Sequence, residues 1–292
     1  MELIFDYMGN DLLRYKLNDL TQKIYGFDFE SWMTGGYFEG DYIPYSFMQD
    51  GKILANVSVN KMHFIQNGVH KYYIQLGTVM TDKAFRNQGL AGKLIKHILE
   101  EYTNKCDGIY LFSNQDALGF YRKIGFKESN QYQYSLKTEW SGRAENGCAF
   151  RKTCEHDEQI KQKYMDAVRN CAVNSALEHI NKFGLQMFYT ANLQNVYYAD
   201  DIDCFAIIEK IEGTLFLQSI ISKQYISMKD VISHIDAAYD SLILGFPPAS
   251  YNFDMFEASV YDDKNDTRLF YCGKDLESIE KERLIFPRLS HA

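Results

Sequence analysis

Proline, basic residues and long apolar runs are all scarce in this chain of 292 residues. It has 4 Pro, and no stretch approaches the ~18 consecutive apolar residues that span a bilayer, so no membrane segment is predicted. Lys and Arg number 31 against 39 Asp and Glu, which gives a net charge of −8. A protein that binds nucleic acid needs a basic face, so the charge balance argues against that class of partner.

Metal-binding and secretion signals are also missing. The six cysteines are scattered, with no C-x-x-C pair and no Cys/His cluster at zinc spacing. A signal peptide begins with basic residues, and the first seven residues of this chain contain none. We therefore expect a cytoplasmic protein with reduced thiols and no metal.

What the chain has in quantity is hydrophobic and aromatic residues. Hydrophobic residues make up 46% of the sequence, and there are 22 Tyr and 20 Phe. This composition indicates a folded globular protein, and the length favours about two domains. A small, polar stretch over 141–154 predicts a connector between a domain at 1–140 and a second domain at 155–292.

Hydrophobic periodicity predicts alternating strands and helices, an α/β (α+β) class. In the first part, strands are expected at 71–81, 108–113 and 126–136, with helices at 89–102 and 116–123 between them. In the second part, a long helix over 155–180 precedes a hairpin at 203–221. A helix from Ser227 to about residue 239 and a strand at 241–246 follow.

The most informative stretch is Arg86-x-x-Gly89-x-Ala91, which stands between a strand and a helix. A helix that begins with small residues presents free N–H groups and a positive dipole end, which suits a phosphate. A P-loop is excluded, because its glycines need four residues between them and Leu94 replaces the Ser or Thr after Lys93. The dinucleotide fingerprint Gly-x-Gly-x-x-Gly is absent as well.

A second block, Asn114-x-x-Ala117-x-x-Phe120-Tyr121-x-x-x-Gly125-Phe126, follows some thirty residues later. Together the two blocks resemble those of the GNAT acetyltransferases over about residues 1–140. The resemblance implies a mixed central sheet whose fourth and fifth strands splay apart around acetyl-CoA. It also implies that the molecule is an enzyme transferring an acetyl group to a primary amine.

The resemblance assigns roles along these blocks. Main-chain groups of Val79, Met80 and Thr81 would bind the pantetheine arm, and Asn114 would hydrogen-bond it. Tyr121 would lie near the thioester sulfur and assist departure of the CoA thiolate. Lys93 would either meet a further phosphate or be a solvated helix residue. The pyrophosphate would be held by the loop residues Arg86, Asn87, Gln88, Gly89, Leu90 and Ala91.

The general base and the acceptor site are less defined. Many GNAT enzymes carry a Glu on the strand before the loop, but residues 75–81 include no carboxylate. The alternatives for the general base are a water chain, Asp28 or Glu30, or a group from the second domain. Asp28, Glu30 and Trp32 belong to an aromatic and acidic stretch that either binds a cationic amine or packs on the sheet.

The second domain repeats the first in outline but lacks its loop. Residues 223–228 contain no Arg-x-x-Gly and no glycine, so we expect a degenerate GNAT-like domain. In tandem relatives the end of the chain reaches the active site, which makes His291 and Ala292 candidate substrate-binding residues. The expected acceptor is a small-molecule or peptide amine. The alternatives are a non-catalytic acyl-CoA sensor and a scaffold that recruits a partner, and the oligomeric state is left open.

Overall fold

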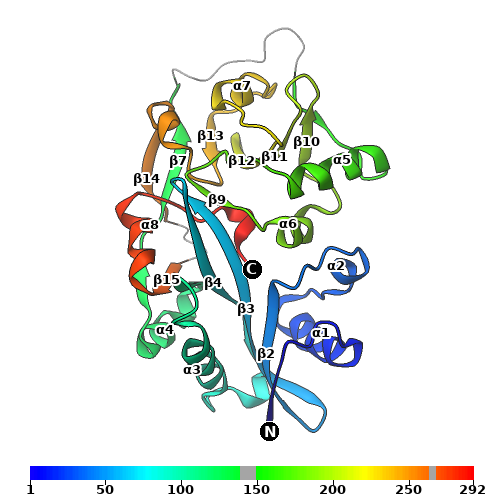
Figure 1. Ribbon diagram of the computed structural model, residues 1–292, viewed down its shortest axis with the longest axis vertical. Coiled ribbons are helices and arrows are strands. Elements are labelled where there is room, and N and C mark those ends of the chain that lie inside the picture. The colour runs from blue at the N-terminus through cyan, green and yellow to red at the C-terminus, as the bar shows by residue number, and fades with distance from the viewer. Residues whose placement is uncertain (139–148, 263–267) are drawn as a thin grey trace.

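The computed structural model describes residues 1–138, 149–262 and 268–292. It has two mixed β-sheets with helices packed around them, as Figure 1 shows, which confirms the α/β class. The long hairpin of β3 and β4 runs through the middle of the molecule. Residues 141–148 of the expected connector, Cys148 among them, lie outside the described residues. The division into two domains stays a prediction.

The first sheet has the strand order β1-β2-β3-β4-β5-β15-β6, with β9 pairing on β3. Its neighbours are antiparallel except for β4 and β5, which are parallel and joined through a helix. The bounds are β1 Glu2–Phe5, β2 Tyr42–Gln49, β3 Lys52–Gln66, β4 Val69–Thr81, β5 Gly108–Ser113, β6 Lys127–Ser129, β9 Leu177–His179 and β15 Arg268–Cys272.

The second sheet has the order β14-β7-β13-β12-β11-β10-β8. It repeats the plan of the first, because a hairpin of β11 and β12 leads through a helix to β13, which is parallel to β12. The bounds are β7 Tyr132–Leu136, β8 Arg151–Lys152, β10 Val196–Ala199, β11 Cys204–Ile211, β12 Thr214–Ile221, β13 Ser241–Leu244 and β14 Phe256–Val260.

The two sheets exchange strands, and this corrects one sequence expectation. The single strand expected at 126–136 is two strands, interrupted at Asn130 and Gln131. Its first half, β6, pairs with β15 in the first sheet, whereas its second half, β7, pairs with β13 and β14 in the second. Pairing partners far away in the sequence decide this break, so local periodicity did not reveal it.

The helices surround the sheets, and their ends follow local capping chemistry. The Asn10 side chain accepts from Leu13 N at 3.2 Å to begin α1, and Gly26 ends it with φ 77°. The helix expected over 155–180 is wrong beyond residue 169, because α5 ends there and residues 177–179 pair with β3. The bounds are α1 Asp11–Tyr25, α2 Glu30–Thr34, α3 Leu90–Tyr102, α4 Leu118–Ile124, α5 Glu158–Arg169, α6 Phe183–Thr190, α7 Met228–Ser233 and α8 Glu277–Lys281.

One hydrophobic core joins the two parts of the chain. It combines Leu17 and Leu20 of α1 with Tyr164 of α5 and Met187 of α6, all almost fully buried. A separate core lies between α3 and the first sheet. Within the described ranges, none of the helices combines the length and the apolar character that crossing a bilayer demands.

Candidate active site

The site begins where β4 and β5 part. These parallel strands pair only over Tyr73–Gln75 and Gly108–Tyr110, so the carboxyl ends of both strands are free of each other. The register of β4 against β3 also shifts here, between Asn56 and Ser58. A bulge and a parting of strands at one place expose main-chain groups that a sheet would otherwise use.

Thr78 carries the strain of this bulge. Its φ is 40°, in the left-handed region that is costly for a β-branched residue. Its hydroxyl lies 2.6 Å from Ser58 Oγ and 2.8 Å from Tyr42 Oη, and its carbonyl accepts from Asn56 Nδ2 at 3.0 Å. Because buried partners hold both ends of the residue, the bulge is fixed in place.

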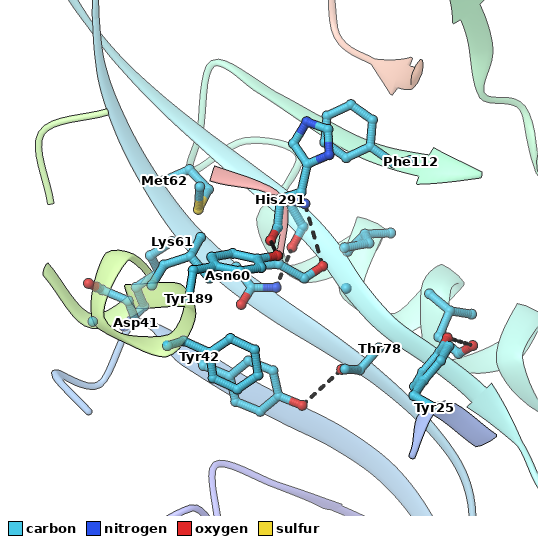
Figure 2. A pocket seen from close by; sticks show the side chains of 18 of the residues that line it. Tyr25, Asp41, Tyr42, Asn60, Lys61, Met62, Thr78, Phe112, Tyr189 and His291 are labelled. Carbon is cyan, nitrogen blue, oxygen red and sulfur yellow. Dashed lines mark hydrogen bonds between the residues drawn. The ribbon is translucent and has the colours of Figure 1, made fainter. Parts of the chain in front are cut away.

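A cavity of about 480 Å³ opens beside the bulge (Figure 2). Its walls come from the segment between α1 and β2, from β3, β4 and the end of β5, from α4, and from α6 with the last two residues of the chain. The second half of the chain therefore supplies part of the site. Of the residues expected at the site, the cavity is lined by Trp32, Val79, Asn114, Tyr121, His291 and Ala292.

The Asn114 side chain uses its carbonyl oxygen within the protein, which leaves its amide nitrogen for a ligand. It follows β5 and begins a short 3₁₀ turn, where its Oδ1 accepts from Ala117 N at 3.1 Å. Its Nδ2 is the group that remains to donate toward the cavity. On the opposite strand the Val79 carbonyl accepts from Tyr25 Oη at 3.1 Å, so one of its two lone pairs is used and the other can accept from a ligand.

Tyr121 presents a buried phenol to the cavity. It is 5% exposed, and its ring packs against Phe120 and Phe270 at centroid distances of 5.1 and 5.8 Å. Burial raises the pKa of the hydroxyl well above its ordinary value near 10. The group therefore stays protonated and acts as a hydrogen-bond donor.

The loop from Arg86 to Ala91 lies outside the cavity lining, at the N-terminus of α3. Gly89 is the residue before the helix, with φ 72°, and no side chain caps the helix there. A Cβ added at Gly89 would meet nothing within 4 Å. By contrast, Ser227 caps α7, the corresponding helix of the second sheet, by accepting from Asp230 N at 3.1 Å. The N–H groups that begin α3 are thus available to an anion, and those of α7 are partly used.

Residues 290–292 lie across the parted strands, as Figure 2 shows in part. The Gln75 amide accepts from Ala292 N at 2.8 Å and donates to the Ser290 carbonyl at 2.7 Å. The His291 ring stacks on the Phe112 ring of β5 with a centroid distance of 3.7 Å. The hydroxyl of Tyr189 of α6 donates to the main-chain carbonyl of His291. His291 is therefore held between the end of β5 and α6.

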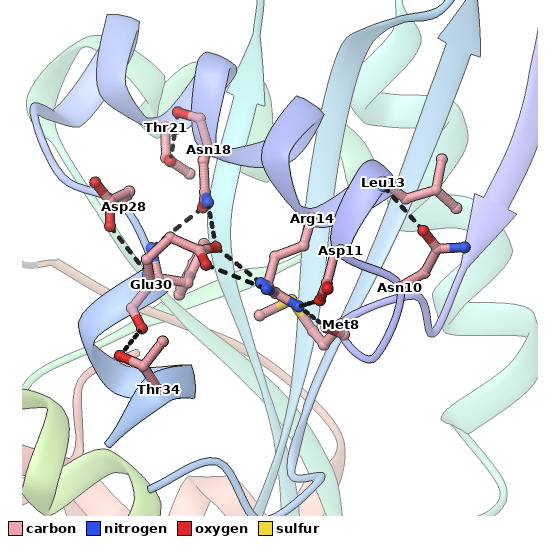
Figure 3. A network of polar contacts seen from close by, with 11 residues as sticks. Met8, Asn10, Asp11, Leu13, Arg14, Asn18, Thr21, Asp28, Glu30 and Thr34 are labelled. Carbon is pink, nitrogen blue, oxygen red and sulfur yellow. Dashed lines mark hydrogen bonds and ion pairs between the residues drawn. The ribbon is translucent and has the colours of Figure 1, made fainter. Parts of the chain in front are cut away.

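Asp28 and Glu30 do not line the cavity. Figure 3 shows that Glu30 faces α1, where Arg14 Nε donates to it at 2.8 Å and Asn18 Nδ2 at 2.7 Å. The hydrogen bond from Arg14 lowers the pKa of Glu30 below 4.5. Asp28 accepts from Glu30 N at 2.9 Å at the beginning of α2. Glu30 therefore holds α1 and α2 together and Asp28 begins α2, and neither of these expected base or acceptor ligands lines the cavity.

Other lining residues were missed at the sequence level. Asp41 precedes β2, and its Oδ2 accepts from Asn181 Nδ2 at 3.0 Å; burial raises its pKa. Tyr189 and Phe188 come from α6. An acid next to a strand was the available signal for Asp41, whereas nothing local connects α6 with a site built on β4. Within the described part of the chain, no three His, Cys, Asp or Glu side chains gather as metal ligands would.

Comparisons with known proteins agree with this geometry. Residues 11–126 match the model of the acetyltransferase (GNAT) family. The N-terminal part of this chain is thus similar to the GNAT family over the matched residues, which supports acyl transfer as its general chemistry.

Solved structures similar over most of the chain share its fold. A GCN5-related N-acetyltransferase from Kribbella flavida has a TM-score of 0.55 at 10% identity, covering 92% of this chain and 70% of that one. Eis1 from Mycobacterium abscessus has a TM-score of 0.55 at 11% identity, covering 92% and 73%. An N-acetyltransferase from Anabaena variabilis has a TM-score of 0.55 at 12% identity, covering 92% and 72%. No curated protein sequence matches the chain.

Proposed function

We propose that this protein transfers an acetyl group from acetyl-CoA to the primary amine of a small molecule or peptide. The observation that carries the proposal is the parting of β4 and β5 at a cavity into which Tyr121 faces. The pyrophosphate would lie on the N–H groups of Gly89, Leu90 and Ala91, which no side chain caps. The pantetheine would run along β4 near Val79 and accept from Asn114 Nδ2.

The chemistry then follows from proton affinities. An amine with a pKa near ~10.4 must lose a proton before its nitrogen attacks the thioester carbonyl carbon. As the N–C bond forms and the C–S bond breaks, negative charge collects on sulfur. Because burial makes the Tyr121 phenol a weaker acid than usual, Tyr121 would stabilise the thiolate by hydrogen bonding without giving up its proton.

We assign removal of the amine proton to His291. Its ring is stacked on Phe112 at the end of β5, beside the place where the thioester would lie. Glu30, the alternative on α2, is engaged by Arg14. An imidazole has an ordinary pKa near ~6.5, which suits a base at neutral pH.

The test combines transfer with binding. Acetyl-CoA is incubated with a panel of primary amines, and free CoA thiol is measured; we expect release that depends on the amine. Acetyl-CoA should also raise the melting temperature, since a ligand that binds the folded state stabilises it. A rise without thiol release would favour an acyl-CoA sensor, and the absence of any rise would favour a scaffold.

A pair of glycine variants tests the phosphate loop. Gly89→Ala and Gly68→Ala both place a side chain at positive φ, at 72° and 84°, with nothing within 4 Å of the new Cβ. Both should therefore cost a similar ~1–2 kcal/mol of stability. Only Gly89→Ala should reduce the stabilisation by acetyl-CoA, because Gly68 lies in the hairpin turn at the other end of β4. Equal responses to acetyl-CoA would contradict the assignment.

A further inference from the structure

One wall of the cavity is built from five aromatic rings, which we call the aromatic wall: Phe27, Phe29, Trp32, Tyr42 and Phe188. They come from the segment around α2, from β2 and from α6, yet their rings touch one another. Ring centroids are 5.0 Å apart for Phe29 and Tyr42, and 5.6 Å for Phe27 and Phe188. The wall is therefore a continuous surface.

The wall is also rigid. The indole Nε1 of Trp32 donates to the Gly184 carbonyl at 2.7 Å in a buried position, which ties α2 to α6. The Tyr42 hydroxyl is held by Thr78 at 2.8 Å. Aromatic side chains that are fixed before a ligand arrives lose little conformational entropy when it binds. Such a surface favours a ligand with a flat apolar body, because rings prefer offset or edge contacts at these distances.

The charges around the cavity argue against a polycation. Among the described lining residues, the side-chain carboxylates are those of Glu39 and Asp41. Glu39 is already paired with the Arg169 guanidinium, and Lys61 also lines the cavity. His179 adds no charge at neutral pH, since burial lowers its pKa to about 3. Of these two side-chain carboxylates, that of Asp41 is thus the one left for an ammonium group, whereas a ligand with several ammonium groups needs an excess of carboxylates.

We propose that the acceptor is a monocationic primary amine with an aromatic or similarly flat apolar body, an arylalkylamine in chemical terms, which seats that body on the aromatic wall. This inference rests on the proposed N-acetyltransferase function and names its substrate class. The body would lie on the surface that Trp32 and Phe188 form together, with the amine directed along β4 toward Gly77. Asp41 is the remaining side-chain carboxylate in the lining, and one ammonium group is what it can neutralise.

The first experiment compares four amines on the full chain with acetyl-CoA: 2-phenylethylamine, tryptamine, n-butylamine and spermidine. We expect kcat/KM for the two arylalkylamines to exceed that for n-butylamine and spermidine by at least ~10-fold, because a buried aromatic body adds about 1.5–3 kcal/mol of transfer free energy. Spermidine turned over as well as, or better than, the arylalkylamines would overturn the inference and leave the proposed transfer standing.

A binding measurement separates the two hypotheses. In the presence of CoA, 2-phenylethylamine should raise the melting temperature more than the same concentration of spermidine does. If it does so but no thiol is released from acetyl-CoA, the proposed function fails and the inference about the site holds. If neither amine stabilises, or spermidine stabilises more, the inference fails.

A substitution in the wall provides the residue-level test. Phe188→Leu should lower kcat/KM for 2-phenylethylamine by about 2- to 12-fold, the worth of an aromatic pair, and leave n-butylamine unaffected. Phe27→Leu, at the other side of the wall, should act alike and serves if the first variant does not fold. The control is Phe253→Leu, because Phe253 stacks on Tyr134 at 5.7 Å and neither residue lines the cavity. Equal effects of Phe188→Leu on both amines would contradict the role of the wall.

Discussion

Replacing Tyr121 by Phe is the sharpest test of the proposed chemistry, because it removes one oxygen and leaves the packing in place. The ring would keep its contacts with Phe120, Phe126 and Phe270, whose centroids lie 5.1 to 6.3 Å away. No described residue hydrogen-bonds the hydroxyl, so its loss leaves no protein group unsatisfied. The variant should therefore be as stable as the natural protein.

The magnitude follows from the role of the hydroxyl. A hydrogen bond to a charged group contributes about 1.5–3 kcal/mol, which corresponds to roughly a 10- to 150-fold change in rate. Since the bond is made to the departing thiolate and not to the intact thioester, the loss should fall on kcat, with KM for acetyl-CoA and stabilisation by acetyl-CoA nearly unchanged. Because burial raises the pKa of Tyr121, its hydroxyl stays protonated throughout this range, so the loss should be the same from pH 7 to 9.

The assay is the amine-dependent release of CoA thiol at saturating acetyl-CoA, together with thermal melts with and without acetyl-CoA. An unchanged kcat would refute the role of Tyr121. A loss confined to KM would show that the hydroxyl binds the cofactor in the ground state. A loss that shrinks as pH rises from 7 to 9 would show that the hydroxyl loses its proton in this range, against the raised pKa of Tyr121.

Two further predictions concern the frame of the site. Gly77→Ala should displace residues 291–292 and lower both kcat and the melting temperature, at a cost of about 1–3 kcal/mol, because its Cβ would stand 2.5 Å from Ala292 O and 2.9 Å from Asn60 Nδ2. The control is Gly92→Ala, whose Cβ would lie 3.8 Å from Phe120. Equal effects of the two substitutions would count against the contact between Gly77 and Ala292. Glu30→Gln should lower the free energy of unfolding by about 1–3 kcal/mol at pH 7, measured by urea unfolding. The difference from the natural protein should shrink as pH falls below 4.5 through the lowered pKa of Glu30, because the ionised carboxylate then no longer contributes. A difference that does not depend on pH would rule out the ion pair as its cause.

Local signals in the sequence were enough for the part of the site that one strand and one helix build. Arg86 to Ala91 and Asn114 to Tyr121 stand in order along the chain, and the elements that carry them are where periodicity predicts them. Trp32 was found through its aromatic neighbours. The sequence did not reveal the contact of Glu30 with α1, because it depends on the burial of Arg14, which is 5% exposed.

What the sequence did not reveal is set by contacts between distant residues. The stretch after Arg169 has helical composition, but the projecting end of β3 offers unpaired main-chain groups, and Leu177 to His179 pair there instead. The approach of α6 to β4, which brings Phe188 and Tyr189 into the site, depends on the shared core between α1, α5 and α6. No pattern within either segment records that contact.

The exchange of strands has a consequence for how the protein is made. β15 stands between β5 and β6 in the first sheet, and β7 stands between β14 and β13 in the second. Residues up to 272 must therefore be synthesised before the first sheet can be completed, although most strands of that sheet are synthesised much earlier. Until then β5 exposes an open edge that other chains could pair with. The two halves are therefore expected to complete folding together.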